Sequence, residues 1–197
     1  MNNLLNFIAS IGFRFREKMT RLGAGARLFF LVLIYSGDSF KRIHLTIREI
    51  YFTGVLSLTI IVVSAFFVGM VLGLQGYYTL EKYGSSEAIG VLVALALVRE
   101  LGPVVTALLF AGRAGTAITA EIGLMKATEQ LSAMEVMAVS PIARIIAPRF
   151  WAGMISMPIL AAIFSMVGVL GGYFIAVLVI GVDEGSFWSQ MQANVDF

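Results

Sequence analysis

The sequence predicts an all-α membrane protein. Of its 197 residues, 59% are hydrophobic and only 13% are charged, whereas soluble domains usually carry about 25% charged residues. Residues 50–80 and 150–182 contain no charged side chain, and each run exceeds the roughly 20 residues that a helix needs to cross a bilayer. A third run, 88–120, is interrupted by three charges, at Arg99, Glu100 and Arg113. We therefore expect three membrane-spanning helices.

Residues 4–22 have helical periodicity, with an apolar face and a basic face. The basic face carries Arg14, Lys18 and Arg21. This pattern predicts an amphipathic helix lying in the headgroup plane, and the alternative is a helix packed on protein. The apolar face carries Leu4, Ile8, Ile11, Phe15, Met19 and Leu22.

Residues 26–35 are apolar but too short to span a bilayer, so we expect them to dip into one leaflet as an elbow. Residues 37–39 (Gly, Asp, Ser) break this segment, and a polar helix follows up to Glu49. We assign residues 1–50 to these interfacial and elbow helices and residues 51–197 to the membrane-spanning domain.

The spans are expected at roughly 52–78, 88–120 and 149–180. Pro103 should kink the second span and Pro158 the third, with neighbouring helices satisfying the freed carbonyls. In the first span, Gly69 and Gly73 have GxxxG spacing. This spacing lets another helix approach closely, although glycine is also common in membrane helices without such a contact.

Basic residues predict the orientation of the chain. Eight of the fourteen Lys and Arg residues precede the first span, and three more, Lys126, Arg144 and Arg149, lie in the loop 121–149. The polar turn 77–87 has only Lys82, and the tail 181–197 has none. The N-terminus and the loop 121–149 are therefore expected in the cytoplasm, with the turn and the tail on the other side.

The loop 121–149 also has internal helical structure. Ser132 and Glu135 have capping-box spacing, so we expect a short helix to begin again there, and Ser140–Pro141 is typical of a further helix start. The loop is either a helix across the cytoplasmic mouth of the spans or a solvated connector without mechanical importance. The apolar stripe of this short helix consists of Ala127, Leu131, Met134 and Ala138.

Signatures of several function classes are missing. The sequence contains no GxxxxGKS or GxxxxGKT phosphate loop, no HExxH and no GxSxG. There is no cysteine, and His44 is the single histidine, so we predict no catalytic residue, no metal site and no bound cofactor. The net charge of +2 gives no reason to expect nucleic acid as a partner.

Arg99 and Glu100 are the sharpest residue-level signal because charges inside a span are costly and usually face a cavity or a partner charge. One interpretation is a polar spot in a substrate cavity that meets a charged headgroup. The other is a structural role, with each residue satisfied by another helix or subunit. Arg113 and Glu121, near the cytoplasmic end, are better explained by snorkelling or by a structural ion pair.

Residues 91–152, which begin VLVALALVRELGP, and residues 54–77 (GVLSLTIIVVSAFFVGMVLGLQGY) resemble the MlaE/YrbE permease family of bacterial ABC transporters. The resemblance covers nearly the whole chain. It implies a permease subunit in the bacterial inner membrane that moves phospholipids between the inner and outer membranes and maintains lipid asymmetry. Family members have five spans, so the resemblance also implies that the chain is incomplete at its C-terminus.

The partners that the resemblance implies are a second copy of the chain, a cytoplasmic ATPase that holds ATP and Mg²⁺, a STAS-domain protein and a periplasmic hexameric ring of MCE-domain subunits. The loop helix would be the coupling helix on the ATPase, with Glu129, Leu131, Met134, Glu135 and Met137 as contact residues. Arg99 and Glu100 would line or support a lipid cavity between the subunits, with an apolar wall of Leu72, Leu74, Tyr77 and Leu97.

Two other functions stay open on the sequence. The chain could be a membrane anchor that tethers the ATPase and the periplasmic ring without binding lipid itself. It could also be an intramembrane lipid enzyme, although the missing nucleophiles and metal ligands argue against that function.

Overall fold

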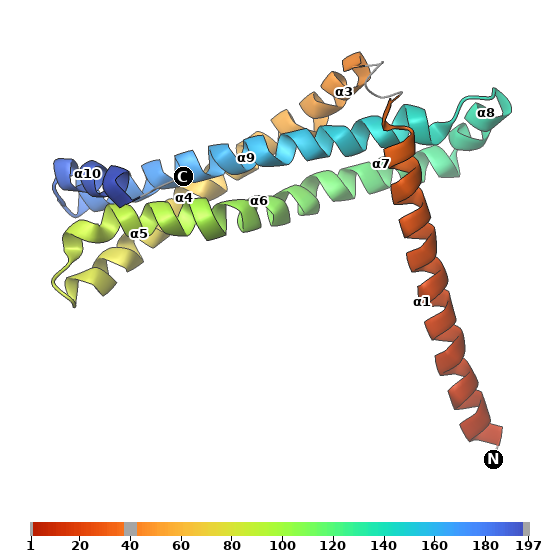
Figure 1. Ribbon diagram of the computed structural model, residues 1–197, viewed down its shortest axis with the longest axis horizontal. Helices are drawn as coiled ribbons and strands as arrows, with labels where there is room; N and C mark the ends of the chain where they lie inside the picture. Colours follow the sequence, from red (N-terminus) through yellow and green to blue (C-terminus); the bar gives the residue numbers. More distant parts are fainter. Residues whose placement is uncertain (1, 38–42, 195–197) are drawn as a thin grey trace.

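The structure is a computed structural model that describes residues 2–37 and 43–194. Every regular element in these residues is helical. Within them, three helical runs, Ile43–Glu81, Ser86–Ala127 and Ile142–Val179, are long and apolar enough to cross a membrane. The three runs lie side by side along most of their length (Figure 1). The prediction of three membrane-spanning helices is confirmed.

Each run contains short π-helical segments, which lie within the first and second runs and at the two ends of the third. At Pro103, which cannot donate a backbone hydrogen bond, the second run changes from a π-helical segment to an α-helix, whereas the third run continues through Pro158 as one α-helix. The first run comprises α3 (Ile43–Ile50), η1 (Tyr51–Val55) and α4 (Leu56–Glu81). The second comprises η2 (Ser86–Ala88), α5 (Ile89–Leu95), η3 (Ala96–Leu101), α6 (Gly102–Phe110), η4 (Ala111–Gly115) and α7 (Thr116–Ala127). The third comprises η5 (Ile142–Ile146), α9 (Ala147–Tyr173) and η6 (Phe174–Val179).

Glycines bring α4 and α9 into backbone contact. A Cβ atom added to Gly69 would lie 1.9 Å from the carbonyl oxygen of Gly168, and one added to Gly73 would lie 3.0 Å from that of Gly172. Side chains at these positions would hold the helices apart, so the small residues set the distance between the first and third spans. The interpretation of the GxxxG spacing as a helix contact is confirmed.

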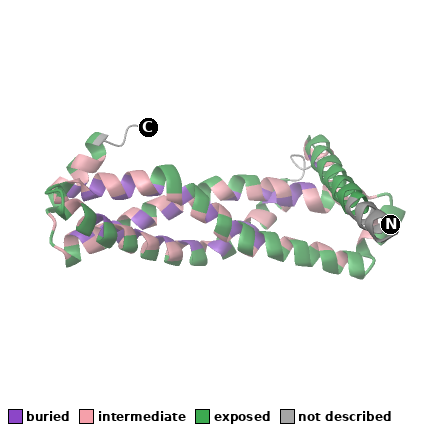
Figure 2. Ribbon diagram, turned by 90° about the horizontal axis from the view of Figure 1, so that it is seen from below, coloured by how far each residue is buried: buried purple, intermediate pink, exposed green. Residues whose placement is uncertain are grey.

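The core lies between the three runs. Ile61 of α4, Val93 of α5 and Phe164 of α9 are fully buried there. Buried residues form stripes along the facing sides of the runs, and exposed residues cover their outer sides (Figure 2). Many of the outer residues are large and apolar, such as Phe67 and Leu108. This arrangement suits helices surrounded by lipid.

The N-terminal segment differs from its prediction. Residues 4–22 and 26–35 were expected to form two elements, but both lie in one continuous helix, α1 (Asn2–Ile34). The expected dip of residues 26–35 into one leaflet stays a prediction. No proline interrupts this segment, and its glycines lower helix propensity without ending the helix. Residues 38 and 39 of the predicted break lie outside the described residues, as do the side chains of Leu4, Ile8 and Ile11 in the apolar stripe.

Helix α1 leaves the bundle at a steep angle (Figure 1). Its contact with the spans includes an edge-to-face pair of Phe29 and Phe150, whose ring centroids are 5.9 Å apart. Phe15, Met19 and Leu22 are exposed, so no described part of the chain covers this apolar face. The apolar face is therefore free for lipid or for another protein, and the position of α1 in the headgroup plane stays a prediction.

The connections alternate between the two ends of the bundle. α8 (Gln130–Val136) lies at the same end as α3, whereas the turn after α4 and α10 (Glu184–Asn194) lie at the opposite end (Figure 1). This is the alternation that the basic residues predict for the loop 121–149 and the turn 77–87. The assignment of the α8 end to the cytoplasm stays a prediction.

Candidate functional site

The loop between the second and third spans folds as a short helix, α8, between two sharp turns. The capping-box prediction was wrong, because α8 begins at Gln130 and Ser132 lies inside it. Glu129 precedes α8 in the left-handed conformation, with φ of 56°. The helix start at Ser140–Pro141 is confirmed: the Ala143 N–H donates to Ser140 Oγ over 3.4 Å.

The C-terminal end of α8 is closed by a Schellman motif. The Val139 N–H donates to the Met134 carbonyl over 2.9 Å and the Ala138 N–H to the Glu135 carbonyl over 3.0 Å. Ala138 has φ of 56°, where glycine is the usual residue. A left-handed alanine costs about 1 kcal/mol, so this turn forms at some cost in stability.

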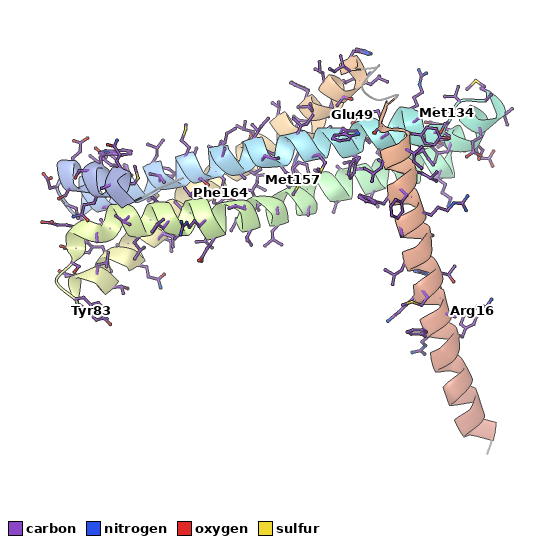
Figure 3. The ribbon with its side chains drawn as sticks, viewed as in Figure 1. Arg16, Glu49, Tyr83, Met134, Met157 and Phe164 are labelled. Carbon is purple, nitrogen blue, oxygen red and sulfur yellow. The ribbon has the colours of Figure 1, made fainter. Side chains whose placement is uncertain are left out.

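The predicted coupling residues divide between two faces of α8. Leu131 and Met134 are partly buried, whereas Glu129, Glu135 and Met137 are exposed. Figure 3 places Met134 at the end of the bundle that carries Glu49, with Tyr83 at the other end. Sequence reasoning missed Val136, which is 88% exposed, the largest value for any large apolar residue in the described chain. We call the exposed Val136 and Met137 the α8 tip.

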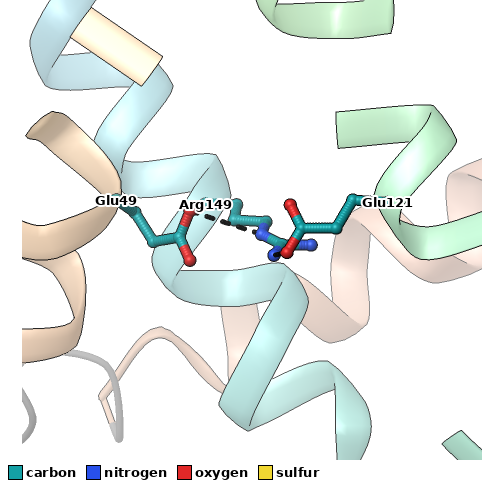
Figure 4. A network of polar contacts seen from close by, with 3 residues as sticks. All are labelled: Glu49, Glu121 and Arg149. Atoms are coloured by element: carbon teal, nitrogen blue, oxygen red, sulfur yellow. Dashed lines mark hydrogen bonds and ion pairs between the residues drawn. The ribbon is translucent and has the colours of Figure 1, made fainter. Parts of the chain in front are cut away.

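Three elements at this end meet at one buried arginine. Arg149 of α9 is only 6% exposed, and its guanidinium pairs with Glu49 of α3 and Glu121 of α7 (Figure 4). Arg149 Nε lies 3.4 Å from Glu49 Oε2, and Arg149 Nη2 donates to Glu121 Oε1. A buried charge requires such partners because desolvation is otherwise costly. We call these three residues the Arg149 clamp.

The sequence predicted only part of the Arg149 clamp. Glu121 forms the ion pair that the sequence suggested, but its partner lies 28 residues away in another span. Arg113 is not in an ion pair within the described residues. Its Nη1 donates to Ser57 Oγ over 2.7 Å. No local pattern marks Arg149 as a partner of two carboxylates, since the pairing depends on how three helices meet.

The predicted lipid-cavity residues do not meet in one pocket of the described chain. Leu97 is fully buried in the core, and Leu72 and Tyr77 pack against that core. Leu74 is exposed, as are Arg99 and Glu100, which lie in η3. Within the described residues, neither Arg99 nor Glu100 forms a hydrogen bond or an ion pair. A shared cavity for the six residues stays a prediction.

The model of the permease MlaE family matches residues 46–197, from α3 to the end of the chain. The chain belongs to the MlaE permease family. It is 53% identical over 194 residues to the intermembrane phospholipid transport system permease protein MlaE of Haemophilus influenzae, covering 98% of this chain and 74% of that protein.

More distant relatives share the MlaE permease region. A probable ABC transporter permease protein of Rickettsia felis is 36% identical over 174 residues, covering 88% of this chain and 67% of the relative. A probable ABC transporter permease protein of Synechocystis is 37% identical over 147 residues, covering 75% of this chain and 56% of the relative. Both alignments are long enough to include more than one of the three spans.

Proposed function

We propose that the chain is the permease subunit of an inner-membrane ABC transporter that moves phospholipids between the inner and outer membranes and so maintains outer-membrane lipid asymmetry. The observation that carries this proposal is the 53% identity, along 98% of the chain, to a phospholipid transport permease. Three adjacent membrane-spanning runs support it, because such runs give a subunit that works inside the bilayer.

In this proposal ATP is hydrolysed on a separate cytoplasmic ATPase, since the sequence has no phosphate loop. The α8 tip is the docking point for that ATPase because it places apolar side chains in solvent at one end of the bundle. A second copy of the chain, a STAS-domain protein and a periplasmic MCE-domain ring complete the assembly, as the sequence resemblance implies.

The mechanism follows from the connections of α8. When the ATPase closes, it displaces α8. The Arg149 clamp joins the helices on either side of α8 to α3, so the displacement passes to the spans together. Arg99 and Glu100 have no described partner, and unpaired charges within a span face a cavity or another chain. We assign them to a lipid cavity between two copies of the permease.

Lipid transfer by the reconstituted complex tests this function. The permease, its ATPase and the accessory subunits are placed in liposomes, and ATP-dependent transfer of a fluorescent phospholipid is measured. We expect transfer by the parent complex and a large loss for Arg99→Ala and Glu100→Ala, with subunit composition unchanged. Full transfer by both variants would exclude the lipid-cavity role. A complex that assembles and hydrolyses ATP but transfers no lipid would favour the alternative of a membrane anchor.

A further inference from the structure

A cavity of about 400 Å³ lies between the first and second spans at the α8 end of the bundle. Its walls come from α3, η1 and the start of α4 on one side and from η4 and α7 on the other. Binding pockets for small ligands have volumes of roughly 300–1,000 Å³. The cavity is therefore large enough for a polar headgroup, and it is separate from Arg99 and Glu100, which do not line it.

The cavity wall is rich in charge for a site between membrane spans. Arg48 and Arg113 line it together with Glu49 and Glu121. Both carboxylates are paired with Arg149, which is not a lining residue. The three guanidinium groups exceed the two carboxylates by one positive charge. Arg149 offsets one of the two carboxylate charges, and Arg48 and Arg113 together exceed the remaining one. The site therefore favours a ligand group with one negative charge.

Hydrogen bonds hold one of the lining arginines in place. Arg113 Nη1 donates to Ser57 Oγ over 2.7 Å, and Ser57 Oγ donates to the Thr53 carbonyl over 2.6 Å. A guanidinium carries five N–H donors, and Ser57 is the one acceptor found for Arg113 in the described chain. Further donors of Arg113 are therefore available to a ligand.

Arg48 adds a second guanidinium. Its Cζ lies 5.8 Å from the centroid of the Phe52 ring. A cation–π contact consumes no N–H donor, and Arg48 forms no ion pair within the described residues. Two guanidinium groups with available donors are the arrangement that proteins use to bind phosphate.

The rest of the wall is apolar and includes Leu45, Leu56 and Ile118. A cationic group beside an apolar surface, at the end of membrane-spanning helices, matches the junction between the phosphate and the acyl chains of a lipid. We propose that this cavity binds the phosphate group of a membrane phospholipid, with Arg48 and Arg113 donating to the phosphate oxygens. The inference rests on the proposed function for the role of that lipid as cargo, held in the leaflet at the α8 end.

Photolabelling of the assembled complex tests the site. The complex is placed in nanodiscs containing a phosphatidylethanolamine with a photoactivatable diazirine near the glycerol, and the labelled residues are identified by mass spectrometry. We expect label on residues of the cavity wall. Arg113→Gln should reduce this label by about tenfold, the loss that follows removal of a charge-assisted hydrogen bond. Arg113→Lys keeps the charge and should retain most of the label.

Matched controls separate phosphate recognition from general lipid contact. Arg144→Gln removes an exposed arginine of η5 that does not line the cavity, and it should leave the label unchanged. A diazirine diacylglycerol, which lacks phosphate, should label the wall about tenfold less. Equal labelling by the two lipids, or no effect of Arg113→Gln, would show that the arginines only extend toward the headgroup region.

Two further outcomes also test whether the cavity binds the phosphate group of a phospholipid. Loss of the label in excess inorganic phosphate would identify a site for free phosphate instead of lipid. Absence of label on the cavity wall in a complex that still transfers phospholipid would overturn the site and leave the proposed function intact. A parent complex without lipid transfer would instead reject the proposed function, whatever the labelling result.

Discussion

Arg149 and Glu121 pair across the two helices that flank α8. Glu121 lies in α7, before the short helix, and Arg149 lies in α9, after it. The pair therefore closes the loop that carries α8, and Glu49 adds α3 to the same contact. Separating α3, α7 and α9 at this end therefore requires that a buried arginine lose its partners.

We expect Glu121→Gln to destabilise the protein by about 1–2 kcal/mol. This is below the 3–5 kcal/mol found for fully buried ion pairs, since Glu121 is 51% exposed. The matched control is Glu17→Gln, which removes an exposed pair with Arg21 on α1 and should cost less than about 0.5 kcal/mol. Thermal unfolding in detergent measures both variants. Equal shifts in the two unfolding temperatures would contradict a special role for the Arg149 clamp.

The contact between α4 and α9 predicts a strong effect at Gly69. In Gly69→Ala the new Cβ would lie 1.9 Å from the Gly168 carbonyl oxygen, so the two helices must move apart, at a cost of about 3 kcal/mol or more. Gly123→Ala, in α7, is the control because no atom lies within 4 Å of its added Cβ. Gly123→Ala should stabilise α7 by up to about 1 kcal/mol. Thermal unfolding in detergent measures both variants. A Gly69→Ala protein as stable as the parent would exclude the close approach of α4 to α9.

Features that depend on composition were predictable from the sequence. The spans follow from long apolar runs, and the contact at Gly69 follows from the spacing of small residues. The boundary between residues 4–22 and 26–35 was mispredicted because apolar length alone does not mark a helix boundary. The start of α8 was mispredicted because Glu129 takes a left-handed conformation that non-glycine residues adopt infrequently.

Features that depend on how the helices meet were not predictable. The Arg149 clamp joins residues 28 and 100 positions apart. The face of the second span that meets the other helices also depends on their packing. Leu97 lies four residues after the buried Val93 and belongs to the core, whereas Arg99 and Glu100 lie on the outside of the bundle.

The left-handed turn after α8 predicts opposite effects for the same substitution at two positions. Ala138→Gly relieves a strained conformation and should stabilise the end of α8 by about 1 kcal/mol. Ala133→Gly, within α8, should destabilise it by a similar amount. Hydrogen exchange at the Val139 amide, which donates to the Met134 carbonyl, measures both effects. We expect protection to rise about fivefold in the first variant and to fall about fivefold in the second. Changes of the same sign would show that φ at Ala138 does not determine the stability of this turn.

The α8 tip predicts a binding defect without a folding defect. Val136 is 88% exposed, so Val136→Asp should leave the unfolding temperature of the isolated protein unchanged. If the ATPase docks there, a carboxylate in the contact should reduce the amount of ATPase that co-purifies by about tenfold or more, as expected at the centre of an interface. The matched control is Tyr83→Asp, since Tyr83 is 80% exposed at the opposite end of the bundle and should retain the ATPase. If both variants retain the ATPase equally, the ATPase does not dock at Val136. If both variants lose the ATPase, the substitutions damage the complex in general.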